Sequence, residues 1–296
     1  MSPARVARGR MRVLEPGALS TIQDLGRPGW FHAGVGVSGA ADRGALRLAN
    51  RLVGNAESAA AVECMLGGLE VEFEIPAVVA VTGASVPITV AGRHEPPASV
   101  LFVGAGQRVR LGTAEAGLRC YLAVRGGIAV EPVLGSRSRD TMAGIGPAPL
   151  RRDDTVPVGA PPHGWPLVDV APVAGPTDAT VRPRVLLGPR ADWFRNATDL
   201  FTGAWQVSTE IDRIGVRLER CADAPALQRV DTGELPTEGM ALGAIQVPPA
   251  GRPVVLLADR PITGGYPVVG TVIDADVDAL GQVRPGQCIE FRSWQR

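Results

Sequence analysis

Short apolar runs separated by turn residues recur along the whole chain. Glycine (37 residues) and proline (26 residues) punctuate these runs, and aromatic residues make up 4% of the 296 positions. Many short strands joined by Gly- and Pro-rich turns are typical of an all-β sandwich or barrel. The pattern therefore predicts a mostly β fold with a few short helices.

Strands are predicted wherever an apolar run is bounded by turn residues. In the first half of the chain these runs are 70–73, 78–82, 87–90, 100–103, 108–111 and 119–124. In the second half they are 185–187, 206–208, 216–218, 244–247, 254–258, 268–273 and 288–292.

Helical periodicity is found in three places. Asp42 is a good N-cap for a helix over 43–53, whose apolar face is formed by positions 46, 49 and 53. The opposite face carries three arginines, namely Arg43, Arg47 and Arg51. A second helix is predicted to start near Asp192 and to continue to Phe201, and a short third one covers 274–280, where Gly281 ends it.

A change of composition divides the chain. Residues 147–183 contain nine prolines and little periodicity, which is typical of a connecting segment. With rounded boundaries, we expect a first β-rich lobe at 11–150, a Pro-rich connecting segment at 151–183 and a second β-rich lobe at 184–296.

Charge and composition argue against several classes of function. The formal net charge is +0 and no basic block is present, which argues against a nucleic-acid or membrane-surface partner. No apolar run approaches the roughly 20 residues that span a bilayer, and residues 1–10 lack the apolar stretch of a secretory signal. The four cysteines and three histidines are dispersed, which predicts reduced thiols in a cytoplasmic protein and no metal site.

The sequence contains no lysine. It therefore offers no residue that could carry biotin covalently, form a Schiff base or act as a P-loop lysine, and it has no G-x-x-x-x-G-K-[ST] motif. Replacement of Lys by Arg throughout a GC-rich genome accounts for this composition without changing these exclusions. If ATP is a cofactor, we expect much of its binding to come from another polypeptide.

The segment 246–267 is the first candidate for chemistry. The apolar run 254–258 leads to Asp259 and Arg260, and residues 263–265 follow as a predicted glycine turn. Strand ends and the turns after them hold polar groups in fixed positions. The N–H groups of this turn would form an anion-binding nest, with Asp259 as the base. A satisfied β-turn is the structural alternative. The predicted substrate contacts of this segment are Gln246, Thr263, Gly264, Gly265 and Tyr266.

Gln23, Asp24 and Arg27 form a second candidate, in a loop bounded by glycines. A carboxylate and a guanidinium there suit a substrate amide or carboxylate, and the alternative is a set of local bonds that hold the loop. Glu63 lies within an apolar run. It would either take part in acid–base catalysis or pair with an arginine, for which the sequence favours Arg27 or Arg51.

Asp212, Arg213 and Arg217 surround Gly215 and form a third candidate. Two arginines at this spacing would hold a carboxylate or phosphate at a partner interface, and the alternative is a β-bulge with local ion pairs. Arg213, Arg217 and the arginines of the 43–53 helix have no obvious local partners in the sequence. This predicts a protein partner and an interface of more than about 1,000 Å².

Ordered motifs between about Val13 and Phe291 resemble the allophanate hydrolase subunit 2 family, also called the biotin-dependent carboxyltransferase family. The motifs lie at 21–29, 39–42, 49–55, 134–138, 211–218, 238–240, 246–267 and 284–286. The resemblance implies a cyclophilin-like β-barrel architecture, and a B-type partner of the allophanate hydrolase subunit 1 family. Ala41, Val216 and the pair Pro261–Ile262 depart from the more polar family pattern, which affects the substrate more than the fold.

The resemblance is compatible with three functions. The first is a component of an ATP-dependent amide or lactam hydrolase, namely the C-type subunit of 5-oxoprolinase, which opens 5-oxoproline to glutamate together with B-type and A-type partners. The second is a carboxyltransferase domain subunit of a biotin-dependent urea carboxylase or allophanate-type system. The third is a non-enzymatic regulator of a kinase-inhibitor partner.

For the hydrolase, Asp259, Asp24 and Glu63 are the catalytic candidates and the arginines bind the anionic groups. We expect Asp259 and Arg27 to share one cleft. We also expect Asp259→Asn, as an isosteric change in a surface cleft, to abolish turnover while folding stays nearly intact.

Overall fold

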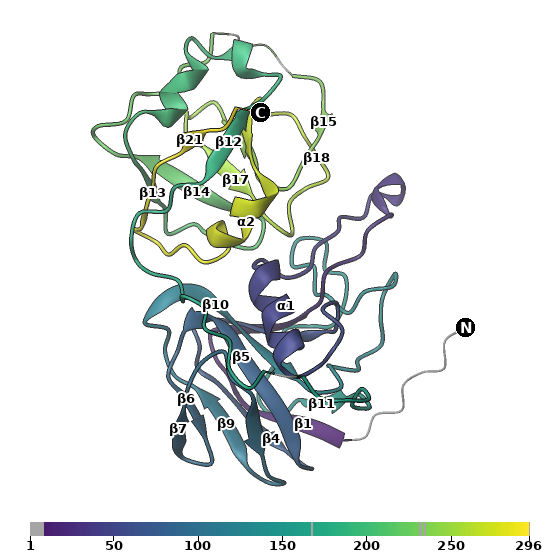
Figure 1. Cartoon of the computed structure of the whole chain (residues 1–296). Helices are drawn as coiled ribbons and strands as arrows, with labels where there is room; N and C mark the ends of the chain where they lie inside the picture. The colour runs from purple at the N-terminus through teal and green to yellow at the C-terminus, as the bar shows by residue number, and fades with distance from the viewer. Residues whose placement is uncertain (1–8, 167, 231–232, 234, 296) are drawn as a thin grey trace. The chain divides into compact units, whose positions relative to one another are not determined.

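The structure, a computed structural model, describes residues 9–166, 168–230, 233 and 235–295 (Figure 1). It contains two units, each with its own hydrophobic core. Unit 2 comprises Pro28–Val37, Thr141–Ala143 and the chain from Asp178 onward, and the rest of the described chain forms unit 1.

Two antiparallel sheets build unit 1. The six-stranded sheet has the order β11-β1-β4-β9-β6-β7, and the five-stranded sheet has the order β2-β3-β10-β5-β8. The first sheet consists of β1 (Gly9–Pro16), β4 (Leu69–Phe73), β6 (Ile88–Val90), β7 (Arg93–Glu95), β9 (Arg108–Leu111) and β11 (Thr155–Val158). The second consists of β2 (Leu19–Gln23), β3 (Ala61–Met65), β5 (Ala77–Ser85), β8 (Leu101–Val103) and β10 (Ala116–Val124).

One hydrophobic core joins these two sheets. In β4 the buried positions alternate with half-buried ones, so Leu69, Val71 and Phe73 enter the core from one face. The five-stranded sheet contributes residues such as Val62 and Leu122 to the same core. Unit 1 is therefore a two-layer sandwich of sheets over a shared apolar interior.

The other face of the five-stranded sheet is covered by helix α1 (Arg43–Leu52), which lies against β5 and β10 (Figure 1). Asp42 is the N-cap, and its carboxylate accepts a hydrogen bond from the Ala45 N–H at 2.8 Å. Leu46 and Ala49 on the apolar face are fully buried in a cluster that includes Tyr121. Strands β3 and β10 are buried along almost their whole length.

Unit 2 is built on an eight-stranded sheet with the order β20-β13-β14-β17-β16-β19-β12-β21. Its strands are β12 (Arg184–Leu187), β13 (Trp205–Val207), β14 (Gly215–Arg220), β16 (Ala244–Gln246), β17 (Val254–Leu256), β19 (Val268–Val272), β20 (Cys288–Ile289) and β21 (Arg292–Ser293). Strands β20 and β21 are consecutive pieces of one segment. The first pairs with β13 and the second with β12, so this segment joins the two edges and closes the sheet into a barrel.

Helix α2 (Asp274–Leu280) contributes Val277 and Leu280 to the core of the barrel. Outside the eight-stranded sheet, β15 (Glu238–Gly239) and β18 (Thr263–Gly264) form a separate two-stranded pair. Three short 3-10 helices complete the described elements, at η1 (Phe31–Ala33), η2 (Ala191–Trp193) and η3 (Ala197–Phe201).

The fold class predicted from the sequence is confirmed: the described chain is mostly β, with a barrel and few short helices. The helix predicted from Asp192 to Phe201 is wrong in type. Phe194 has an extended backbone, and the side chain of Asn196 caps η3, so the segment breaks into two 3-10 turns. Several strands, among them β1, β2 and β3, are absent from the prediction.

The Pro-rich stretch is more ordered than its composition suggests. Within it, β11 pairs antiparallel with β1, and the Val100 N–H donates to Asp169 O. The main body of unit 2 begins at Asp178, close to the expected start of the second lobe. Among the described residues, the helices are all too short or too polar to cross a membrane.

Candidate functional site

A row of four polar side chains crosses the five-stranded sheet of unit 1. Thr21 on β2 stands opposite Glu63 on β3, which stands opposite Tyr121 on β10, which stands opposite Thr82 on β5. All four lie on the face that carries α1, because neighbouring residues of these strands enter the core on the other side. The Thr82 hydroxyl donates to Ala45 O at 2.7 Å and so ties the sheet to the first turn of the helix.

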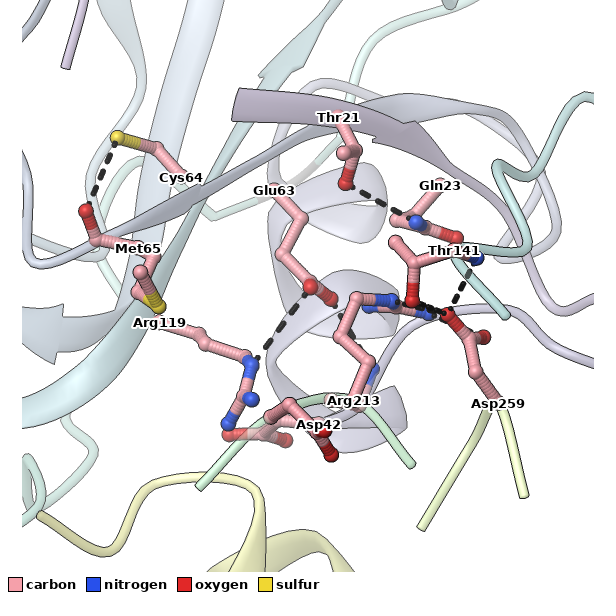
Figure 2. Close-up of polar contacts among 12 residues, drawn as sticks. Thr21, Gln23, Asp42, Glu63, Cys64, Met65, Arg119, Thr141, Arg213 and Asp259 are labelled. Atoms are coloured by element: carbon pink, nitrogen blue, oxygen red, sulfur yellow. Dashed lines mark hydrogen bonds and ion pairs between the residues drawn. The ribbon is translucent and has the colours of Figure 1, made fainter. Parts of the chain in front are cut away.

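Glu63 is the acidic member of this row, and Figure 2 shows its contact with Arg119. Its Oε2 accepts hydrogen bonds from the Tyr121 hydroxyl (2.7 Å) and from the Ala41 N–H (3.0 Å). Its Oε1 lies 3.7 Å from Nε of Arg119, and both side chains are almost fully buried. A buried carboxylate is tolerated here because an opposite charge and two hydrogen-bond donors surround it.

The sequence analysis favoured Arg27 or Arg51 as the partner of Glu63 and did not consider Arg119, which lies beside it. Arg119 precedes Tyr121 by two positions on β10, so both side chains point to the face where Glu63 lies. Arg51 instead pairs with Glu57, at 2.9 Å.

Tyr121 connects the row to the start of α1. Its hydroxyl oxygen accepts a hydrogen bond from the Asp42 N–H at 2.8 Å while its proton is donated to Glu63. Burial raises the pKa of the Tyr121 hydroxyl well above its ordinary value, and the Glu63 and Asp42 carboxylates raise it further. Tyr121 is therefore a permanent donor, and it fixes the segment that leads into the helix.

Asp24 organises a second polar cluster of unit 1. Its Oδ1 accepts from the hydroxyls of Ser136 (2.6 Å) and Ser138 (2.5 Å) and from the Gly26 N–H (2.7 Å). Its Oδ2 accepts from the Arg137 N–H at 2.6 Å. These four donors, three on Oδ1 and one on Oδ2, hold the segments around Gly26 and Ser136–Ser138 to a carboxylate that is 7% exposed.

Gln23 and Arg27 belong to the same cluster. The Gln23 amide donates to Thr21 Oγ1 and to Arg139 O, and the Arg27 guanidinium donates to Ser138 O. Both side chains are fully buried or nearly so. The structure thus brings together the three residues predicted for this loop, and it shows that Gln23 ends strand β2 rather than lying in the loop.

Asp259 and Arg213 form the central ion pair of unit 2 (Figure 2). Arg213 Nε lies 2.9 Å from Oδ2 of Asp259, and Arg213 Nη2 lies 3.0 Å from Oδ1. The N–H of Thr141 (2.8 Å) and its hydroxyl (2.7 Å) also donate hydrogen bonds to Oδ2. The Asp259 side chain is 0% exposed, so the expectation that it lies in a surface cleft is wrong.

Asp212 and Arg217 hold the chain around Gly215. Asp212 Oδ1 accepts from the N–H groups of Ile214 (2.8 Å) and Gly215 (2.9 Å), and its Oδ2 lies 3.7 Å from Nη1 of Arg217. Arg217 Nη1 also donates to Glu210 O at 2.9 Å. Local ion pairs of this kind were the alternative to an anion-binding partner interface in the sequence analysis.

The arginines that motivated a partner interface therefore have local partners. Arg213 pairs with Asp259, Arg217 with Asp212, and Arg47 and Arg51 with Glu57. The description of these side chains as unpaired charges was wrong, because the sequence does not reveal which acidic residues the fold brings close to them.

The residues 263–265 do not form the predicted nest. Thr263 and Gly264 pair with Gly239 and Glu238 as strand β18, and neither Gly264 nor Gly265 has a positive φ. Successive N–H groups of a strand point in opposite directions, so they do not converge on one anion. A side chain at Gly264 would displace the Gln246 amide, because a Cβ there would lie 2.6 Å from Nε2 of Gln246.

Gln246 and Tyr266 lie near this strand. Gln246, at the end of β16, is 7% exposed, and its amide donates to Tyr266 O at 3.4 Å. The side chain of Tyr266 is exposed. Arg260 donates from Nε to Met240 O at 3.0 Å, which links the Asp259 end of the segment to the strand pair β15–β18.

The predicted residues thus fall into three groups: the Gln23–Asp24–Arg27 cluster and Glu63 in unit 1, the Asp259–Arg213–Asp212 cluster in unit 2, and the Gln246–Thr263–Tyr266 region in unit 2. The sequence analysis missed Thr21, Arg119, Tyr121 and Thr141. Tyr121 was detectable in principle, as one of 2 tyrosines and the sole polar ring in an apolar strand.

Among the described residues, no group of three or more His, Cys, Asp or Glu side chains could hold a metal ion.

Comparison with known proteins agrees with this β architecture and with the ordered motifs. The carboxyltransferase domain family, subdomains A and B, matches residues 33–293. The chain belongs to this family.

The chain is also similar to individual proteins and solved structures. The chain is 37% identical over 288 residues to the C component of 5-oxoprolinase from Escherichia coli, covering 95% of this chain and 90% of the relative. The crystal structure of TTHA0988 superposes with a TM-score of 0.86 at 35% identity, covering 97% of this chain and 56% of that one. The urea amidolyase of K. lactis superposes with a TM-score of 0.90 at 28% identity, but this chain spans 19% of it.

Proposed function

We propose that this chain is the C-type subunit of an ATP-dependent 5-oxoprolinase, which opens the lactam of 5-oxoproline to glutamate. The observation that carries the proposal is the match to the Escherichia coli subunit over nearly the full length of both chains. In contrast, the chain corresponds to a small part of urea amidolyase. A match that covers 95% of this chain and 90% of the relative supports the assignment as a C-type subunit.

The reaction explains why buried arginines and oriented carboxylates suit this role. Opening a lactam at neutral pH is slow because resonance stabilises the amide. Phosphorylation of the carbonyl oxygen, followed by addition of water, needs cations for the phosphate, a base for the water and donors for the developing oxyanion. We assign anion binding to Arg27 and Arg213, and activation of water to Asp259.

The remaining candidates receive supporting roles in this proposal. Asp24 and Glu63 each accept several hydrogen bonds from backbone and side-chain donors, so we assign them the positioning of the loops around the substrate. Gln246 and the segment 263–266 line the substrate through side-chain and strand-edge donors. Asp259 shares its Oδ2 with Thr141 and Arg213, and would release the Thr141 hydroxyl when it accepts a proton.

Partner subunits complete the proposed enzyme. The Escherichia coli relative is named as one subunit of a larger enzyme, and the present chain has no lysine and no P-loop. ATP is therefore bound in large part by a B-type subunit of the allophanate hydrolase subunit 1 family and by a separate A-type subunit. We expect the chain alone to hydrolyse neither ATP nor 5-oxoproline.

A second candidate function is a carboxyltransferase domain in a biotin-dependent urea carboxylase system. The family description and the TM-score with urea amidolyase favour it. Biotin would then be carried on another chain, since this one has no lysine. The same arginines would hold carboxylate or carboxyphosphate groups.

Phosphate release tests the two functions directly. The purified chain, alone and co-expressed with the proteins encoded beside its gene, is assayed for ATP hydrolysis with 5-oxoproline or with urea. The proposal expects activity with 5-oxoproline only in the assembled complex, at a rate on the order of 1 per second or more. Stimulation by urea and bicarbonate would support the carboxylase instead. A stable complex without either activity would point to a regulator.

A further inference from the structure

Gln23 is held in one orientation by two hydrogen bonds. It ends strand β2, and its side chain is 0% exposed. Its Nε2 donates to Thr21 Oγ1 at 3.0 Å and to the backbone carbonyl of Arg139 at 2.9 Å (Figure 2 shows the Thr21 contact). Because a carbonyl oxygen only accepts, the amide cannot be rotated to place Oε1 there.

This orientation presents Gln23 Oε1 as an acceptor. Within the described part of the chain, no donor reaches this buried oxygen. An acceptor that is removed from water without a hydrogen bond is destabilising, and such atoms in native proteins usually have a bound partner. The donor for Oε1 is therefore expected to come from a molecule outside the described chain.

A complementary atom lies on a neighbouring residue. Arg139, whose carbonyl orients Gln23, has a buried Nε for which the described residues supply no acceptor. Its Nη1 donates to Gly144 O (2.9 Å) and Gly146 O (3.2 Å), so the guanidinium is otherwise fixed. The same Arg139 carbonyl accepts from Ser38 Oγ at 3.2 Å. Gln23 Oε1 is thus a buried acceptor, and Arg139 Nε a buried donor, for which the described residues supply no hydrogen-bond partner.

We propose that Gln23 Oε1 accepts a hydrogen bond from the N–H of the substrate's amide, which makes Gln23 the residue that selects lactams over lactones. This inference rests on the proposed function and adds that the site recognises the N–H group of the substrate. In a lactone of the same ring, an oxygen replaces the N–H, so two acceptors face each other and the buried Oε1 keeps no donor. Sites built around such a bond reject the analogue that lacks the donor.

The test uses the assembled complex that turns over 5-oxoproline. The KM for 5-oxoproline is measured together with the inhibition constant of the matching γ-lactone acid, in which the ring N–H is replaced by oxygen. In the wild-type complex, the lactone should bind at least about 10-fold more weakly than the lactam. Gln23→Met should raise the KM by about 10- to 100-fold and change the lactone constant by less than about twofold.

Two further variants support the measurement. Gln206→Met changes an exposed glutamine on β13 and should leave both constants unchanged. If Gln23→Met does not fold, Thr21→Val removes one of the two bonds that orient the Gln23 amide, and it should weaken lactam binding selectively but less strongly.

The inference is overturned if the wild-type complex binds lactam and lactone equally, or if Gln23→Met weakens both alike. An unchanged KM in Gln23→Met would also overturn it, since that result means that Oε1 holds only a permanent water. In each of these cases the proposed function stands, because the complex still turns over 5-oxoproline. If no complex binds or turns over 5-oxoproline, both proposals fail.

Discussion

Glu63 and Tyr121 stand directly opposite each other on β3 and β10, and the tyrosine hydroxyl donates to the carboxylate over 2.7 Å. The same hydroxyl oxygen accepts the Asp42 N–H, and Asp42 caps helix α1. One cross-strand pair therefore connects a sheet residue to the start of a helix that lies on that sheet.

Removal of the Tyr121 hydroxyl should destabilise unit 1. Tyr121→Phe leaves the Asp42 N–H and the Glu63 Oε2 each without one partner inside the protein, at a cost of about 1–3 kcal/mol. Urea denaturation measures the change in the free energy of unfolding. Tyr266→Phe is the matched control, because that side chain is exposed, and it should change stability by less than about 0.5 kcal/mol. Equal effects of the two variants would refute the central role of Tyr121.

Asp259→Asn should lower stability as well as activity. The change removes the counter-charge of Arg213 in a fully buried pair, and loss of one partner of such a pair costs about 3–5 kcal/mol. Glu219→Gln, in the exposed pair with Arg252, serves as a control with little expected effect. If Asp259→Asn retains the wild-type melting temperature and loses only turnover, the structural role of the ion pair is wrong.

The Arg184–Asp276 pair should make stability depend on pH. The guanidinium and the N–H of Arg184 donate to the Asp276 carboxylate at 2.7–2.8 Å, which lowers the pKa of Asp276 below its usual value. A lowered pKa in the folded state stabilises the protein above the unfolded pKa of about 3.9. This contribution is lost as the pH falls through the lower folded pKa.

Thermal melts of the wild type and of Asp276→Asn test this pH dependence. The wild type should melt a few degrees higher at pH 7 (on the order of 2–4 °C), and the difference should shrink toward zero as the pH is lowered below about 4. A difference that stays constant from pH 7 to pH 3 would show that the carboxylate charge is not responsible.

The two glycines of the predicted turn should respond differently to alanine. At Gly264 a Cβ would lie 2.6 Å from Gln246 Nε2 and 3.4 Å from Met240, whereas at Gly265 it would lie 3.7 Å from Leu235 O, an ordinary van der Waals distance. Gly264→Ala should displace the Gln246 amide and cost about 1 kcal/mol. Gly265→Ala should be neutral or slightly stabilising. Similar losses in both variants would favour a turn conformation that only glycine adopts.

The shared cleft of Asp259 and Arg27 remains a prediction. Asp259 belongs to unit 2, where it pairs with Arg213, and Arg27 belongs to unit 1, where it donates to Ser138 O. A crystal structure of the assembled complex with a bound substrate analogue decides whether both side chains contact it. Contact by one of them alone would rule out the shared site.

Several elements of this fold could be predicted from the sequence, because their burial follows a simple period. Strand β9 has the predicted limits, since buried and exposed positions alternate along it, and α1 was recognised from its cap and its apolar face. Strands β2 and β3 were missed for the opposite reason. Both of their faces are covered, so Thr21 and Glu63 occur within buried strands and the alternation is lost.

The contacts of the site residues could not be predicted from the sequence. The chemistry of Asp259 and Asp24 is visible in the sequence, but their side-chain donors are more than 40 positions away, as in Arg213, Ser136 and Thr141. Which donors meet a carboxylate depends on strand pairing and loop packing. A single sequence does not determine these contacts, so the same residues were compatible with catalysis and with loop organisation.

The closure of the unit 2 barrel by Cys288–Ser293 has a consequence for how this protein can be shortened or tagged. Removing that segment would leave β12 and β13 as open edges, with backbone donors and acceptors facing water. Open edges of this kind pair with other chains and promote aggregation. The Cys288–Ser293 segment is therefore expected to protect both edges of the unit 2 sheet from pairing with other chains.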